Sequence, residues 1–278
     1  MLTVAARTFV GSVKTVNQDA YCVLVGQAGP KEVGLLAVCD GVGGLSSGEL
    51  ASSVAVRELS RWFEGGVARG LADSAPAGGL ALSDVRRLWT GYFEDLNGRM
   101  WAYSQNLNVR MGTTFTGVVL AGGGFVVGHV GDCRAYRLGP DGAELLTRDQ
   151  TLVQRELDAG RISAKQARRH PQASVILQAL GAQESLAPAF SFGEAAPGDT
   201  LLICSDGLHR RLDEGDLALL SEAEGTEEAL LDALDTLIAR AIDRGEKDNI
   251  TAVCARIGGL RADGDDEPTL AVPLRGGE

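Results

Sequence analysis

The chain has 278 residues, a formal charge of −11 and 45% hydrophobic residues. These values are typical of a folded globular protein and exclude a disordered chain. The excess of acidic residues argues against a nucleic-acid-binding protein, because binding to the phosphate backbone requires a basic surface. No apolar run reaches the roughly 18 residues that a membrane span needs. The first ten residues lack the pattern of a signal peptide, so we expect no leader and no membrane partner.

The cysteine pattern indicates the cellular compartment. There are five cysteines, an odd number, and no two of them have the CxxC spacing of a metal or redox site. Each lies in or beside an apolar run, so we expect buried, reduced thiols and a cytoplasmic protein. These residues are Cys22, Cys39, Cys133, Cys204 and Cys254.

The first half of the chain reads as strands followed by two helices. Apolar runs predict strands at 20–26 and 34–39, separated by a Gly- and Pro-containing turn. Apolar residues at helical spacing then predict an amphipathic helix over 47–63. We expect a loop at 65–84, where Gly, Ala and Pro are frequent, and a second helix from Val85 to about Gln105.

The second half returns to strands and ends on a helix and a strand. The expected strands are 114–120, 125–130, 133–138, 143–147, 200–205 and 250–257. Ser163 and Gln166 form a capping box for a short helix, and 226–242 is a strongly amphipathic helix. Because the strands come in hairpin-linked runs and the helices in separate groups, the pattern favours an α+β fold with antiparallel sheets and helices outside.

Four aspartates stand at the ends of predicted strands. Asp19 begins one strand and Asp40 ends the next, so an antiparallel pairing would place them side by side at one sheet edge. Asp206 ends the strand 200–205 and Asp248 precedes the last strand, which repeats the arrangement. The Asp-Gly dipeptide itself is uninformative, since its frequency is close to chance; it is the placement of the aspartates that matters.

A cluster of four carboxylates requires cations, because like charges repel one another. Oxygen ligands without nearby histidine or thiol suit Mg²⁺ or Mn²⁺ better than Zn²⁺. Two such ions close together form a hydrolytic centre that polarises a phosphoryl oxygen and activates a water molecule. The placement of the acids therefore favours metal-assisted hydrolysis.

The ordered motifs of the chain resemble those of the bacterial metal-dependent protein phosphatases of type 2C. The resemblance runs from about residue 7 to 257. It is carried by Asn17-Gln18-Asp19, Asp40-Gly41-Val42-Gly43-Gly44, Gly112-Thr113-Thr114, Gly131-Asp132, Leu146-Thr147-Arg148-Asp149, His170-Pro171, Ser205-Asp206-Gly207-Leu208 and Asp248-Asn249-Ile250. It implies a four-layer α/β/β/α sandwich of two antiparallel sheets flanked by helices. The implied division is a catalytic domain at 1–258, with a flap at about 150–195, and a flexible acidic tail at 259–278.

The family's metal ligands carry over position by position. By this resemblance Asp40 would bridge two metal ions and the carbonyl of Gly41 would bind one of them. Asp206 and Asp248 would hold the first ion, and Asp19 the second, partly through water. The implied reaction is in-line attack on phosphorus by a hydroxide that bridges the two tightly bound ions.

The resemblance also implies a weaker metal site, and the chain departs from the family's pattern at three positions. Asp132 would join Asp206 in a third, weaker site, as in bacterial relatives. Lys14 stands where the family usually has a phosphate-gripping arginine, and a lysine offers a point charge instead of a two-pronged fork. Gln18 replaces a frequent Glu, which would weaken the second metal site. Val42 replaces the histidine of eukaryotic members, so the leaving group must take its proton elsewhere.

The resemblance implies a cytoplasmic serine/threonine protein phosphatase that uses Mn²⁺ or Mg²⁺. Its expected partners are proteins phosphorylated by a signalling kinase, and we expect a monomer. Two alternatives remain open: a non-catalytic, regulatory protein that binds a partner through the same fold, and a two-metal nuclease or small-molecule phosphohydrolase. Retention of every metal-binding aspartate disfavours the first, and the acidic charge disfavours a nuclease.

Overall fold

The computed structural model describes residues 1–28, 31–42, 47–72, 81–167, 169–258 and 274–276. Part of the glycine-rich run after Val42 and most of the expected tail therefore lie outside the described residues. Among the helices described, none has the length and apolar character needed to cross a bilayer.

Two antiparallel sheets form the centre of the molecule. The first has five strands in the order β1-β10-β9-β6-β7. The second has six, in the order β11-β2-β3-β4-β5-β8. The strands of the first sheet are β1 (Leu2–Phe9), β10 (Ile250–Ile257), β9 (Thr200–Cys204), β6 (Arg134–Gly139) and β7 (Gly142–Leu145). Those of the second are β11 (Leu274–Gly276), β2 (Asp19–Ala28), β3 (Lys31–Asp40), β4 (Phe115–Ala121), β5 (Gly124–Val130) and β8 (Ala189–Glu194).

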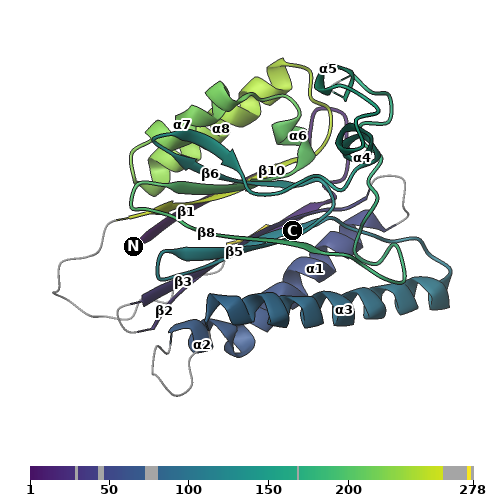
Figure 1. The fold of residues 1–278 in the computed structure, drawn as a ribbon, viewed down its shortest axis with the longest axis horizontal. Helices are drawn as coiled ribbons and strands as arrows, with labels where there is room; N and C mark the ends of the chain where they lie inside the picture. Colours follow the sequence, from purple (N-terminus) through teal and green to yellow (C-terminus); the bar gives the residue numbers. More distant parts are fainter. Residues whose placement is uncertain (29–30, 43–46, 73–80, 168, 259–273, 277–278) are drawn as a thin grey trace.

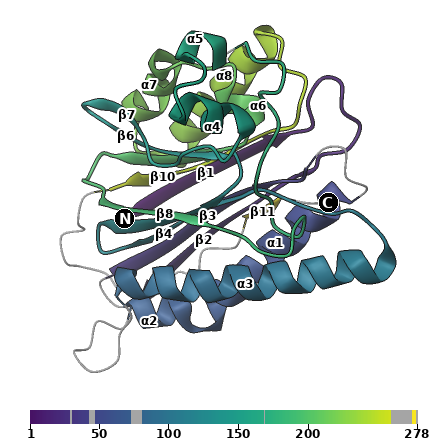
Figure 2. The same cartoon turned by 45° about the vertical axis from the view of Figure 1, so that its right-hand side comes forward.

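Helices cover the outer face of each sheet (Figure 1). The six-stranded sheet is covered by α1 (Gly48–Trp62), the π-helical turn Phe63–Val67, α2 (Ala68–Ala72) and α3 (Leu82–Leu107). The five-stranded sheet is covered by α6 (Asp206–His209), α7 (Glu214–Glu222) and α8 (Glu227–Asp243). Two short helices, α4 (Leu152–Asp158) and α5 (Ala164–Ala167), belong to the expected flap (Figure 2). The expected four-layer α/β/β/α sandwich is confirmed.

Three hydrophobic cores lie between the four layers of the sandwich. Along β3, Leu35 and Ala37 face the core beneath α1 and α3, whereas Leu36 and Val38 face the core between the sheets. The third core packs α7 and α8 onto the five-stranded sheet. Because both faces of the central strands are buried, these strands read as continuous apolar runs and not as alternating ones.

The structure differs from the sequence expectation in several elements. The expected loop at 65–84 is helical up to Ala72, because Phe63, Val67 and Leu71 recur at helical spacing and are buried against the sheet. The strand β8 and the helix α7 were not expected. Of the tail at 259–278, the structure describes 274–276, which form an edge strand paired with β2.

Candidate metal centre

The hairpin of β2 and β3 brings two of the predicted acids together. In its register Asp19 stands directly opposite Asp40, as the sequence predicted. The main chain of Asp40 is fixed by the Thr-Thr pair that precedes β4. Its N–H donates to Thr114 Oγ1 at 2.9 Å, and its carbonyl accepts from Thr114 N at 2.8 Å and from Thr113 Oγ1 at 2.9 Å. This threonine pair therefore positions the carboxylate that the resemblance places between two metal ions.

The backbone after Asp40 is held in a close approach that only glycine permits. Gly41 N donates to the carbonyl of Gln18 at 3.0 Å. A Cβ on Gly41 would lie 2.5 Å from the backbone of Gly48 and 2.8 Å from the Gln18 carbonyl. Such contacts are shorter than real Cβ atoms make, so a side chain here would push α1 away from the site.

The other two predicted acids come from neighbouring strands of the opposite sheet. β9 and β10 are antiparallel neighbours. Asp206 begins α6 just after β9, and Asp248 lies two residues before β10. The loop that carries Asp248 is fixed by Glu246, whose Oε1 accepts from Asp248 N at 3.0 Å. The same end of the sandwich thus carries acids from both sheets.

Two side chains that were not predicted to act here tie the sheets together at this end. Ser205 Oγ donates to Asp19 Oδ2 at 2.9 Å, which joins β9 to β2. Asn249 Oδ1 accepts from Gln18 N at 2.9 Å, and its Nδ2 donates to the carbonyls of Val10 and Val16. The amide of Asn249 therefore fixes the loop before Asp19 against the strand that follows Asp248.

Lys14 lies at the rim of this acid cluster. Its Nζ is 2.8 Å from Asp248 Oδ1, and both side chains are about two-fifths exposed. The hydrogen bond to Asp248 raises the pKa of Lys14, with further contributions from Asp40 and Asp206. The position predicted for a phosphate-binding cation therefore holds a fully charged amine next to the acids.

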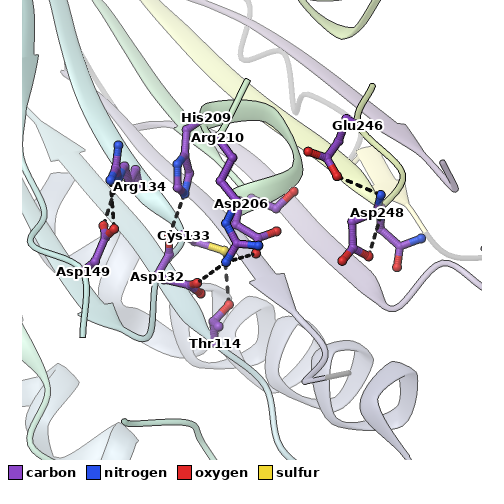
Figure 3. A network of polar contacts seen from close by, with 12 residues as sticks. Thr114, Asp132, Cys133, Arg134, Asp149, Asp206, His209, Arg210, Glu246 and Asp248 are labelled. Atoms are coloured by element: carbon purple, nitrogen blue, oxygen red, sulfur yellow. Dashed lines mark hydrogen bonds and ion pairs between the residues drawn. The ribbon is translucent and has the colours of Figure 1, made fainter. Parts of the chain in front are cut away.

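Asp132 lies in the same cluster but is paired with an arginine. It precedes β6, and its side chain is 5% exposed. Nη2 of Arg210 stands 3.2 Å from Asp132 Oδ2 and 2.7 Å from Asp206 Oδ2. Figure 3 shows the Arg210 side chain pointing between these two carboxylates, with Asp248 farther along the site.

Four carboxylates of the cluster, those of Asp19, Asp40, Asp132 and Asp206, are held in an environment that opposes their charge. Burial, together with repulsion from Asp206 and Asp248, raises the pKa of Asp19 to about 7. Burial and repulsion from Asp206 raise the pKa of Asp132 to about 8, although Arg210 acts in the opposite direction. Burial first, and then repulsion from the neighbouring aspartates, raises the pKa of Asp40 well above its usual range. The nearby positive side chains therefore do not fully neutralise the negative charge of the cluster.

The donor chemistry fits divalent cations with oxygen ligands. Within the described part of the chain, Oδ1 of Asp19 and Oδ1 of Asp206 are buried without a hydrogen-bond partner. No group of three or more His, Cys, Asp or Glu side chains in the described ranges has closed around one point that could hold an ion. The acids therefore lie near one another and two of their buried oxygens have no hydrogen-bond partner, but the described side chains do not form a complete ligand shell.

An open cleft of about 1160 Å³ extends from this cluster toward the flap. Of the clustered acids, Asp132 lines this cleft next to Arg210, and the rest of its wall comes from β6, β7, α4, α5, α6 and the start of α7. The wall mixes apolar groups such as Leu157 and Leu212 with charged ones. This cleft has room for a chain segment beside the acid cluster.

Arg210, Ser205 and Asn249 are the residues of the site that the sequence analysis missed. Asn249 and Ser205 stood beside the predicted acids in the sequence, but nothing indicated where their side chains would reach. Arg210 could have been found, because a side chain four residues after Asp206 lies on the same face of a helix.

Comparison with known proteins agrees with this geometry. The family model described as protein phosphatase 2C matches residues 11–240. The serine/threonine protein phosphatase PstP of Mycobacterium tuberculosis is 34% identical over 281 residues, which cover 99% of this chain and 49% of that protein. The chain thus spans about half the length of this curated relative.

Solved structures give the same result. The serine/threonine phosphatase Stp1 of Staphylococcus aureus superposes with a TM-score of 0.80 at 28% identity, covering 93% of this chain and 96% of that one. The catalytic domain of PstP in complex with two manganese ions has a TM-score of 0.71 at 31% identity, with 93% and 99% of the chains covered. From its fold, its acid cluster and these matches, the chain belongs to the protein phosphatase 2C family.

Proposed function

We propose that the protein is a metal-dependent serine/threonine protein phosphatase. The observation that carries the proposal is the cluster of Asp19, Asp40, Asp206 and Asp248, drawn from both sheets to one end of the sandwich. A non-catalytic, regulatory relative would have no need to keep four like-charged acids together at one end of the sandwich. The named activities of the relatives in this family support the same conclusion.

Two ions, Mn²⁺ or Mg²⁺, would be held by these acids and the Gly41 carbonyl. Asp40, which stands opposite Asp19, would contact both ions, Asp206 and Asp248 would hold one, and Asp19 the other. The related catalytic domain of PstP, solved in complex with two manganese ions, supports a site for two ions. When bound, the ions would supply an activated water for in-line attack and would neutralise charge on the phosphoryl group.

The residues around the acids would orient the substrate. Lys14, whose amine is charged and lies 2.8 Å from Asp248, would contact a phosphoryl oxygen at the rim. The cleft would take the peptide chain that flanks the phosphorylated residue. With Val42 in place of a histidine, the alkoxide of the leaving serine or threonine would receive its proton from a water molecule in the site.

The cellular setting follows from the same observations. All five cysteines are buried in the structure, which supports a reducing, cytoplasmic environment. The partners would be proteins phosphorylated by a serine/threonine kinase in a signalling pathway, with the enzyme acting as a monomer. Nucleic acid would not be a partner, since the chain has a net charge of −11.

The proposal is tested by phosphatase assays on the purified chain. We expect Mn²⁺-dependent hydrolysis of p-nitrophenyl phosphate and of a phosphothreonine peptide, abolished by EDTA and by Asp40→Ala. Asp141→Ala is the matched control, because Asp141 also precedes a glycine but lies exposed in the β6–β7 turn. Faster turnover of sugar phosphates or DNA than of the phosphopeptide would favour the other two-metal hydrolases, and activity that persists in Asp40→Ala would refute the metal assignment.

A further inference from the structure

Arg210 makes the most unusual contact of the site. A single nitrogen, Nη2, lies within ion-pair distance of both Asp132 and Asp206, at 3.2 and 2.7 Å. These two carboxylates are the pair that the resemblance assigns to a third, weaker metal ion. Their side chains are 5% and 10% exposed, whereas that of Arg210 is 30% exposed. The guanidinium therefore reaches from the cleft into a nearly buried acidic pair.

The local backbone holds the arginine in this position. Arg210 N donates to the carbonyl of Asp206 at 3.0 Å, which closes the turn of α6. The preceding residue, His209, contacts the carbonyl of Asp132 through Nε2 at 2.9 Å. Consecutive residues of one turn thus fix both the main chain and the carboxylate of Asp132 (Figure 3). The two ion pairs come from one side chain, and these backbone contacts hold its base next to Asp132.

The charges of the cluster do not call for a third ion. Five carboxylates, those of Asp19, Asp40, Asp132, Asp206 and Asp248, would face two divalent ions and one guanidinium, and Lys14 beside Asp248 adds a further positive charge. A guanidinium stays protonated at every accessible pH. A third divalent ion would either stand against this fixed positive charge in a partly desolvated site or displace it from two ion pairs. Both routes oppose binding of the ion.

We propose that Arg210 is a built-in cation that takes the place of the third metal ion between Asp132 and Asp206. The inference rests on the proposed two-ion site and limits that site to two ions. Asp132 then acts through Arg210, as a positioning residue and not as a metal ligand. The positive charge on this side of the site is accordingly independent of the metal concentration.

Counting of bound ions tests the proposal. Mn²⁺ is titrated into the metal-free 278-residue chain up to millimolar concentration, with free ion measured by electron paramagnetic resonance and heat by calorimetry. We expect two ions for the wild type and for Arg61→Ala, an arginine on α1 that pairs with Glu58 instead. Arg210→Ala should bind a third ion at least about 10-fold more tightly than the wild type does, and Arg210→Ala/Asp132→Asn should lose it again.

The outcomes separate this inference from the proposed function. Three ions on the wild type, or two on a folded Arg210→Ala, would overturn the role of Arg210 and leave the phosphatase proposal in place. Failure of the wild type to bind any ion would overturn both. If Arg210→Ala does not fold, Arg210→Gln keeps most of the side-chain volume without the charge, and the same counts apply.

Discussion

At the scale of single residues, the site depends on which charge stands beside each carboxylate. Lys14 lies against Asp248 and Arg210 lies against Asp132 and Asp206. One cation is a flexible amine at the rim, and the other is a planar group set into the cluster. The first can move toward a substrate, whereas the second is held by two ion pairs.

Lys14→Arg should strengthen the grip on a phosphoryl group. A guanidinium can donate two parallel hydrogen bonds to the group, where an amine acts as a point charge. We expect the KM for a phosphopeptide to fall about threefold with kcat nearly unchanged. Steady-state kinetics with Lys165→Arg, an exposed position on α5, provides the control. An unchanged or higher KM in Lys14→Arg would count against contact with the phosphate.

Asp132→Ala should leave the number of tightly bound ions at two. Its carboxylate contacts Arg210, and the two ions are assigned to the other four acids. Turnover should fall by roughly 10-fold or more, because the guanidinium loses one of the two partners that orient it. Calorimetry with Mn²⁺ and measurement of kcat check the two parts. Loss of a tight site on calorimetry would show that Asp132 is itself a ligand of one of the two ions.

At the scale of elements, short connections between strands determine how closely the acids approach. The turn from β9 into α6 passes so close to β10 that a Cβ on Gly207 would lie 2.1 Å from the carbonyl oxygen of Asn249. The two acid-bearing segments therefore touch through their backbones. A glycine is required at this position because of the neighbouring main chain, since backbone atoms cannot move aside as a flexible side chain can.

Gly207→Ala should destabilise the protein by roughly 2–3 kcal/mol, because the added methyl group forces β10 away from α6. Gly98→Ala is the matched control. Gly98 lies on the exposed side of α3 with nothing within 4 Å of a Cβ, so alanine there should stabilise the helix by about 0.5–1 kcal/mol. Urea denaturation of both variants measures the difference. Equal stabilities would show that the turn can adapt at little cost.

The sequence predicted the elements that have strong patterns and missed those with weak ones. The strand over 250–257 matches β10, and the strongly periodic helix over 226–242 corresponds to α8. The edge strand β8 is half exposed, so it shows no continuous apolar run. The helix α7 has nine residues, too few for a clear apolar stripe. A strand that is buried on both faces appears in the sequence as a continuous apolar run, whereas a partly exposed strand has no such pattern.

The pairing of Asp19 with Asp40 was predictable because consecutive strands form hairpins. The convergence of the two sheets on one site was expected from the resemblance, while the residues that join them were not. Ser205 reaches Asp19 across 186 positions of sequence, and Asn249 reaches Gln18 across 231. Such long-range contacts depend on how the two sheets pack, and local sequence patterns do not predict that packing.

At the scale of the whole molecule, a buried histidine lies in the core between the sheets. His129 contacts Thr116 Oγ1 at 2.8 Å through Nδ1 and the carbonyl of Arg148 at 3.1 Å through Nε2. Burial lowers its pKa from 6.5 to about 4. Between these pH values the unfolded chain therefore binds a proton that the folded protein does not, and stability falls as the pH falls.

Acidification from pH 7 to pH 4 should therefore cost the wild type on the order of 2–3 kcal/mol through this residue. His129→Gln removes the titrating group, so its stability should be lower at pH 7 but should decline less steeply toward pH 4. Urea denaturation at several pH values, on metal-free protein, measures both slopes. Identical slopes in the two proteins would show that His129 does not contribute to the acid sensitivity.

The order of strands in the five-stranded sheet determines when the catalytic end can form. The first strand of the chain, β1, pairs only with β10 among the described strands, and β10 in turn lies between β1 and β9. During synthesis on the ribosome, β1 must therefore wait without a strand partner until residues 250–257 emerge. A chain arrested before that point could form the β2–β3 hairpin with Asp19 and Asp40, yet under the proposed function it could not bind ions as the complete fold would. Binding of the proposed divalent ions is thus expected to be a late, post-translational event that follows completion of the fold.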